Sequence, residues 1–148
     1  YVILVFIIFY LIMLMVYASG SKRAFSEVEK AVSSVLNSDE LTKMDERMLK
    51  KNFGLNSADY QGVMYYASPS SVSAAEVLLI QVKNESQTDA VTDAIEKRKA
   101  QRMEDFEGYL PEEVKLLEDA QLSVRGKYIF YAVSSDASKY RNTFDKSL

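Results

Sequence analysis

The chain has no histidine and no cysteine, which removes most of the usual catalytic chemistry. Histidine is the commonest general base near neutral pH, and the two residue types together supply most zinc ligands and the thiol nucleophile. The sequence also contains no SxxK, GxSxG, P-loop or GxGxxG pattern. Two bare dipeptides, Ser21-Lys22 and Ser138-Lys139, are typical of solvated surface residues. We therefore expect no enzyme, no catalytic residue and no cofactor.

Acidic side chains crowd the segment around Gly108. Carboxylates gathered on one loop can hold Ca²⁺ through their oxygens, but the spacing here is not that of an EF-hand. Acids that directly follow Pro111 are also explained by the first turn of a helix, where the positive end of the helix dipole favours them. The acids concerned are Glu104, Asp105, Glu107, Glu112 and Glu113. We interpret them as a solvated surface and expect no metal site.

Two aromatic residues, Phe106 and Tyr109, stand on either side of Gly108. If exposed, they would form a tip that binds a partner; if buried, they would fill the core beneath the loop, which is the commoner place for a large ring. A third aromatic residue, Tyr10, lies in the middle of an apolar N-terminal segment, where its hydroxyl could reach a neighbouring helix. Tyr10, Phe106 and Tyr109 are therefore the candidate partner-binding residues.

Four further tyrosines, Tyr65, Tyr66, Tyr128 and Tyr131, lie on segments that alternate as strands do. Neighbours on a strand point to opposite faces, so one face of a sheet could display some of these rings to a sugar or protein ligand. Tyrosine is also well suited to a half-buried strand. We favour the second interpretation.

Residues 1–18, YVILVFIIFYLIMLMVYA, contain no charged residue, Gly or Pro. At about 1.5 Å per residue this run reaches roughly 27 Å, close to a hydrocarbon thickness of about 30 Å. Tyr1 and Tyr17 stand where an aromatic belt would lie. A cleaved secretory signal is the alternative, because Ala18-Ser19-Gly20 offers small residues to a peptidase. We expect a transmembrane helix over 1–18 in contact with membrane lipid, and a natural N-terminus upstream of Tyr1.

The remaining residues, 19–148, hold all 18 Lys and Arg residues and all 21 Asp and Glu residues. Such an even balance argues against a nucleic-acid partner, which would need a basic face. No Gly-, Pro- or Ser-rich linker divides the segment, and its length suits one domain. We therefore predict a single domain over 19–148.

Hydrophobic periodicity predicts nine elements in the order ααββααββα. Ser38 and Asp39 are predicted to cap the second helix, Gly54 to end it, and Ser86 to open a capping box for the long third helix. The predicted ranges are 25–36, 38–53, 60–67, 76–83, 86–107, 111–117, 122–125, 127–134 and from 135 onwards. Consecutive hairpins favour an α+β fold with a mostly antiparallel four-stranded sheet and helices packed on one face.

Two stretches resemble a known bacterial family. They are 76–134, with LLIQVK, GYLPEE and GKYIFYAVS, and 52–71, NFGLNSADYQGVMYYASPSS. They are similar to the family catalogued as domain of unknown function 4358, which has no assigned activity. The resemblance implies a Gram-positive, extracytoplasmic protein attached to the membrane by an N-terminal span or a lipid. It also associates the family with gene neighbourhoods of membrane-bound O-acyltransferases, which is a hint about partners. This chain lacks the Cys that lipid attachment would need.

The resulting hypothesis is a non-catalytic accessory subunit or scaffold on the outer face of the cytoplasmic membrane. It would associate through its span with a larger integral membrane protein, for which a cell-envelope O-acyltransferase is the candidate. The alternative is a free-standing envelope module that binds cell-wall polymer or peptide; a hydrolase with an unrecognised Ser or carboxylate site is the least favoured. Because Lys22 and Arg23 would by themselves favour the cytoplasmic side, the extracytoplasmic placement rests on the resemblance.

Overall fold

The computed structural model describes the backbone of residues 1–20 and 23–148. It describes the side chains of residues 1–14 and 23–148. Tyr17 and Lys22 therefore lie outside the described side chains. The helices are α1 (Val2–Gly20), α2 (Phe25–Ser33), α3 (Glu46–Phe53), α4 (Thr88–Phe106), α5 (Pro111–Glu118) and α6 (Ala137–Ser147). The strands are β1 (Thr42–Lys43), β2 (Gly62–Ala67), β3 (Glu76–Gln81), β4 (Gln121–Arg125) and β5 (Tyr128–Val133).

The five strands form one antiparallel sheet in the order β1-β2-β3-β5-β4. The prediction of four strands was therefore wrong. The fifth strand, β1, lies inside the range expected for the second helix, because Met44 N–H donates to the carbonyl of Tyr65 at 2.8 Å and extends the sheet edge. The helix starts later, where the Asp45 carboxylate accepts from Met48 N–H at 3.1 Å. Gly54 ends it in the left-handed conformation, φ 69°, which confirms the predicted end.

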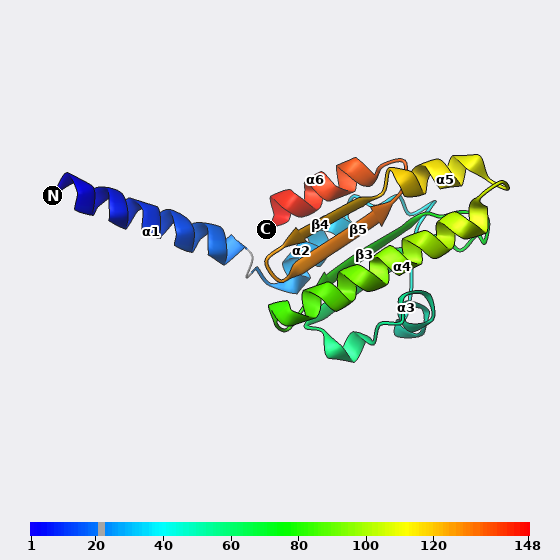
Figure 1. Cartoon of the computed structure of the whole chain (residues 1–148), viewed down its shortest axis with the longest axis horizontal. Coiled ribbons are helices and arrows are strands. Elements are labelled where there is room, and N and C mark those ends of the chain that lie inside the picture. Colours follow the sequence, from blue (N-terminus) through cyan, green and yellow to red (C-terminus); the bar gives the residue numbers. More distant parts are fainter. Residues whose placement is uncertain (21–22) are drawn as a thin grey trace.

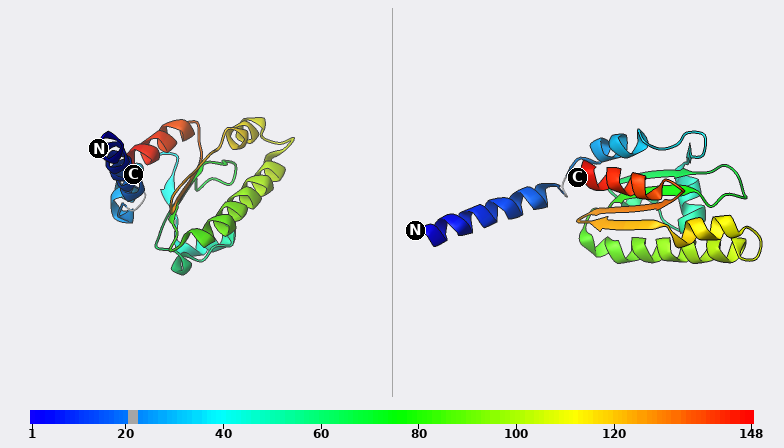
Figure 2. Two further views of the ribbon diagram at one scale, coloured as in Figure 1. Left: turned by 60° about the vertical axis from the view of Figure 1, so that its left-hand side comes forward. Right: turned by 90° about the horizontal axis from the view of Figure 1, so that it is seen from above.

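Helices cover both faces of the sheet, so the prediction of helices on one face was wrong (Figures 1 and 2). Helices α3, α4 and α5 pack on the face that carries Leu78 and Ile80, and α2 and α6 pack on the face that carries Val77 and Leu79. The central strand β3 is apolar on both sides along nearly its whole length. A strand of that kind needs a cover on each face, which makes the fold a three-layer α+β sandwich.

The start of α4 also differs from the prediction. A short 3-10 turn, Glu85–Gln87, precedes the helix, and Asn84 caps that turn by accepting from Ser86 N–H at 3.1 Å. Gln87, at the N-cap of α4 itself, makes no capping hydrogen bond with its side chain. The capping box predicted at Ser86 is therefore wrong, because Ser86 is occupied as a donor to Asn84.

Helix α1 projects away from the sandwich (Figure 1). In the part of the chain that the structure describes, no helix combines the length and hydrophobicity that crossing a membrane requires. The prediction of a transmembrane helix over 1–18 is therefore wrong for the part of the chain that the structure describes.

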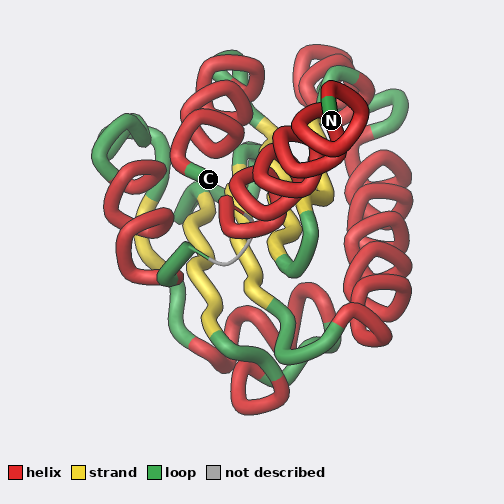
Figure 3. Tube along the Cα trace, turned by 90° about the vertical axis from the view of Figure 1, so that its left-hand side faces the viewer, coloured by secondary structure: helices red, strands yellow, loops and turns green. Residues whose placement is uncertain are grey.

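The sandwich has two distinct ends, defined here by their distance from α1. The α1 end carries the start of α2, the β4–β5 turn, the end of β3 and the C-terminus (Figures 1 and 3). The distal end carries the β2–β3 loop, the α4–α5 loop and the carboxyl end of β5 (Figure 1). Candidate binding features are found at both ends.

Candidate functional site

The three residues predicted to bind a partner lie in three different environments. Tyr10 is 62% exposed on α1. Phe106 is buried in the core beneath the α4–α5 loop, with the Arg102 guanidinium 4.5 Å from its ring centroid. Tyr109 is 67% exposed at the distal end. Burial removes Phe106 from the surface that a partner could touch, whereas Tyr10 and Tyr109 stay accessible; their partner contacts stay a prediction.

The β2–β3 loop at the distal end is tied to α4 and α5 by polar contacts. Arg102 on α4 donates to the carbonyl of Ser73 in the β2–β3 loop at 3.1 Å. Glu113 on α5 accepts from the backbone N–H of Ala74 in the same loop at 2.9 Å. These contacts join the β2–β3 loop to α4 and α5, the two helices on either side of Tyr109 in the sequence, so Tyr109 projects from a braced part of the surface.

The strand tyrosines form no exposed platform. Tyr65, Tyr128 and Tyr131 are buried, and only Tyr66 is half-buried. The alternation of β2 and β5 places Tyr65 and Tyr131 in the core under α3 and α4, and Tyr128 in the core under α2 and α6. A sugar-binding face made of these four rings is therefore excluded.

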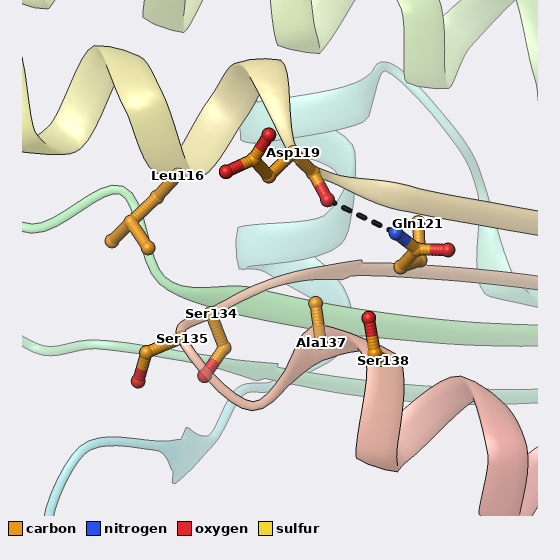
Figure 4. Close-up of a pocket in the computed structure, with 7 residues that line it drawn as sticks. All are labelled: Leu116, Asp119, Gln121, Ser134, Ser135, Ala137 and Ser138. Carbon is orange, nitrogen blue, oxygen red and sulfur yellow. Dashed lines mark hydrogen bonds between the residues drawn. The ribbon is translucent and has the colours of Figure 1, made fainter.

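A pocket of about 340 Å³ lies at the carboxyl end of β5. Its wall comes from the end of α5, the start of β4 and the turn into α6 (Figure 4). Ala137 and Ser138 face Gln121 across it, and the Gln121 amide donates to the carbonyl of Asp119 at 3.2 Å (Figure 4). The lining is Leu116, Asp119, Gln121, Ser134, Ser135, Ala137 and Ser138. Sequence reasoning missed this pocket, because three serines near a helix start match no motif.

The polar partners of Ser134 decide what the pocket could do chemically. Ser134 is 4% exposed; its hydroxyl donates to the Glu40 carboxylate at 3.2 Å and accepts from Asp136 N–H at 3.1 Å. Burial raises the pKa of Glu40; the hydrogen bond from Ser134 opposes the rise, and the Asp136 and Glu113 carboxylates add to it. A nucleophile needs access to substrate and an oriented base. Ser134 is instead held inside an ST-type turn, so the pocket can offer hydroxyl hydrogen bonds rather than an activated serine.

A buried ion pair crosses the core beneath α4. Glu76 is 1% exposed and accepts from Arg98 Nε at 3.1 Å and from Arg98 Nη2 at 3.2 Å. The Tyr65 hydroxyl donates to Glu76 at 2.8 Å and accepts from the Asn52 amide at 2.8 Å. Burial, followed by the Glu76 charge, raises the pKa of Tyr65. Every charge here has a partner, and a satisfied network of this kind stabilises one arrangement of the core.

The acids around Gly108 do not come together as a cation site. Among the described residues, no three acidic side chains converge closely enough to hold a metal ion. Glu107 and Glu112 are exposed, and Asp105 instead accepts hydrogen bonds from Gln101 at 3.0 Å and from Arg102 at 3.3 Å.

Comparison with known proteins identifies the family. No curated protein and no solved structure matches the chain. A family model described as "Domain of unknown function (DUF4358)" matches residues 33–134. This range includes every strand, α3 to α5 and most of the serine pocket, and it is more than half of the sequence. The chain therefore belongs to the family of the domain of unknown function 4358.

Proposed function

We propose that the protein is a non-catalytic accessory subunit that associates through α1 with a larger integral membrane protein. The observation that carries the proposal is the surface of α1. Its described side chains, from Val2 to Leu14, are all apolar or aromatic, and their exposed fractions lie between 75% and 46%. A helix that is apolar on every side needs an apolar cover, and an exposed patch of this size marks a site of interaction.

The non-catalytic part of the proposal is supported by the chemistry of the described pockets. In the serine pocket the Ser134 hydroxyl is held by Glu40 and by Asp136 N–H, and the buried carboxylate of Glu76 is paired with Arg98. The sequence contains no His and no Cys, so it lacks the commonest general base and the thiol nucleophile.

The experiment exchanges α1 for an unrelated apolar helix of the same length. The full chain and the exchanged chain are purified in mild detergent from the cells that make them, beside a Tyr109→Ala control that keeps α1. We expect an integral membrane protein to accompany the full chain and the Tyr109→Ala chain in fixed proportion, and to be lost from the exchanged chain. Retention by the exchanged chain would contradict the proposal, because the specificity would then lie in the domain.

We also propose that the domain lies outside the cytoplasm, which is supported by what the family resemblance implies. Protease added to intact cells should then remove residues 23–148. Complete protection of the domain, with digestion only after the cells are lysed, would contradict this placement.

A second function is favoured by Tyr109, whose ring is 67% exposed on braced loops at the distal end. In that case the protein is a free-standing envelope module that binds cell-wall polymer or peptide. Binding of wall fragments that is lost in Tyr109→Ala and kept in the chain with the exchanged helix would select this function over the first.

A further inference from the structure

A basic cavity of about 410 Å³ lies at the α1 end of the domain. Three cationic residues line it, Arg23, Lys83 and Lys127, together with Gln61 and Gln81 and no acidic residue. They come from four places: the segment before α2, the segment before β2, the end of β3 and the β4–β5 turn. The α1 end of the domain therefore concentrates positive charge in one concave site.

The backbone around the cavity is held in place. The Phe25 ring lies so close to Gly62 that a Cβ on Gly62 would come within 2.4 Å of it, and the ring stacks on Tyr128 at a centroid distance of 6.5 Å. The Tyr128 hydroxyl donates to the carbonyl of Arg23. Val82 N–H donates to the carbonyl of Lys127 at 2.8 Å, which joins the two lysine-bearing segments.

The two lysines keep most of the charge that a ligand would meet. Arg23 is already paired with Glu27 at 3.0 Å. Lys83 Nζ donates to a neutral acceptor, the carbonyl of Ala58, at 3.2 Å. Lys127 Nζ makes no hydrogen bond or ion pair with any residue that the structure describes. A monoanion or dianion entering the cavity would therefore meet two lysine charges that no carboxylate among the described residues pairs with.

We propose that this cavity binds the phosphate headgroup of an anionic lipid. The positive charge of the cavity favours an anionic ligand. The apolar helix α1 leads away from this same end of the domain (Figures 1 and 3), and this position favours a lipid over a soluble anion. A headgroup in the cavity would leave its acyl chains at the end of the domain from which α1 projects (Figure 1). Lysines near a lipid surface contribute about 1 kcal/mol each to binding of anionic lipid. The inference rests on the proposed docking of α1 in an apolar environment.

The test uses the full chain in neutral detergent, with dioctanoyl phosphatidylglycerol as the probe and dioctanoyl phosphatidylcholine and inorganic phosphate as comparisons. Binding is followed through the backbone amide resonances of Gln81, Lys83 and Lys127. The variant is Lys83→Gln with Lys127→Gln, and the matched control is Lys50→Gln with Lys51→Gln, an equal charge change at two exposed lysines of α3 that do not line the cavity. Thermal melts confirm that all chains are folded.

We expect saturable binding of the phosphatidylglycerol, weakened on the order of 30-fold in the cavity variant and little changed in the control. The phosphatidylcholine and inorganic phosphate should bind much more weakly. Equal binding of both lipids, equal loss in both variants, or inorganic phosphate binding as tightly as the anionic lipid would overturn the proposal. The last outcome would assign the cavity to a free or polymer-borne phosphate. None of these results would affect the association of α1 with an integral membrane protein. The lipid-binding proposal can therefore be wrong while the proposed function is right.

Discussion

The two ends of the domain carry pockets of opposite character. At the α1 end, three cationic residues and no acid line the cavity. At the carboxyl end of β5, three serines and one aspartate line the pocket, and no cationic residue does. The exposed apolar surface also differs, since α1 is apolar on all of its described sides while the distal end offers Val72 and Tyr109.

We propose that the α1 end attaches the protein to its partner and that the distal end presents a surface to a ligand. The α1 end combines apolar surface with positive charge, which are the two properties that suit a membrane protein and its surrounding lipid. The distal end combines hydroxyls, an exposed ring and braced loops, which suit a polar ligand. The sandwich between them must be rigid for one end to hold the other in position. The predictions that follow test this rigidity first and then each end.

The largest effect is expected in the core that joins the two ends. Glu76→Gln removes the charge that compensates Arg98, whose side chain is only 15% exposed. Leaving a buried charge without its partner costs about 3–5 kcal/mol, which urea denaturation followed by circular dichroism would measure. The matched control is Glu112→Gln at an exposed position, expected within about 0.5 kcal/mol of the parent. Equal stability of the two variants would mean that the ion pair does not hold the core.

A smaller effect is expected at the α1 end from Gly62→Ala. The new methyl group would lie 2.4 Å from the Phe25 ring, so the segment after α1 must move. Overpacking of this kind costs about 1–3 kcal/mol. In a double-mutant cycle, Phe25→Ala should relieve much of the cost. If the effects of the two substitutions on the free energy of unfolding were fully additive, the Phe25 ring would not be in contact with Gly62 in solution.

Alkaline pH should lower the free energy of unfolding through Tyr128, which lies at the α1 end of the domain. Burial, together with the nearby Glu27 carboxylate, raises the pKa of Tyr128 to about 12 from its ordinary value of 10.0. Between these values the unfolded chain loses the phenol proton while the folded chain keeps it, so the free energy of unfolding falls as the pH rises. The slope for this group reaches about 1.4 kcal/mol per pH unit. Tyr128→Phe should have a shallower pH dependence from pH 10 to 12, and an unchanged slope would show that Tyr128 is not the group that titrates.

The smallest effect on stability is expected at the distal end. Tyr109→Ala removes a ring that is 67% exposed, so the free energy of unfolding should change by less than about 0.5 kcal/mol. Loss of ligand binding without loss of stability would identify this end as a binding surface. A destabilisation of several kcal/mol would instead show that the ring is part of the core.

The parts of the fold that follow from local pattern could be predicted from the sequence. Alternation along β3 and β5, Pro111 at the start of α5 and Gly54 at the end of α3 each act within a few residues. The strand β1 could not be predicted, because its two residues become a strand only by pairing with the edge of β2. The second helical layer was missed for the same reason: which face a helix covers is a property of the assembled sheet.

The candidate sites were harder to predict than the fold. The sequence marked Tyr109 as a possible tip by its place beside Gly108, but the same argument applied equally to Phe106, which is buried. The basic cavity joins residues from four segments of the chain, and the serine pocket joins residues from two. No spacing in the sequence could indicate such neighbours, whereas the apolar character of α1 was evident from composition alone.

The central claim, that α1 is the docking element, is tested most directly by site-specific photo-cross-linking in cells. A benzophenone amino acid replaces Tyr10 in one chain, Tyr109 in a second, and the exposed Lys97 on α4 as a control in a third. The account predicts a cross-linked product with a larger integral membrane protein from position 10, absent from the Lys97 control. A product from position 109 alone, with none from position 10, would contradict it and assign recognition to the distal end.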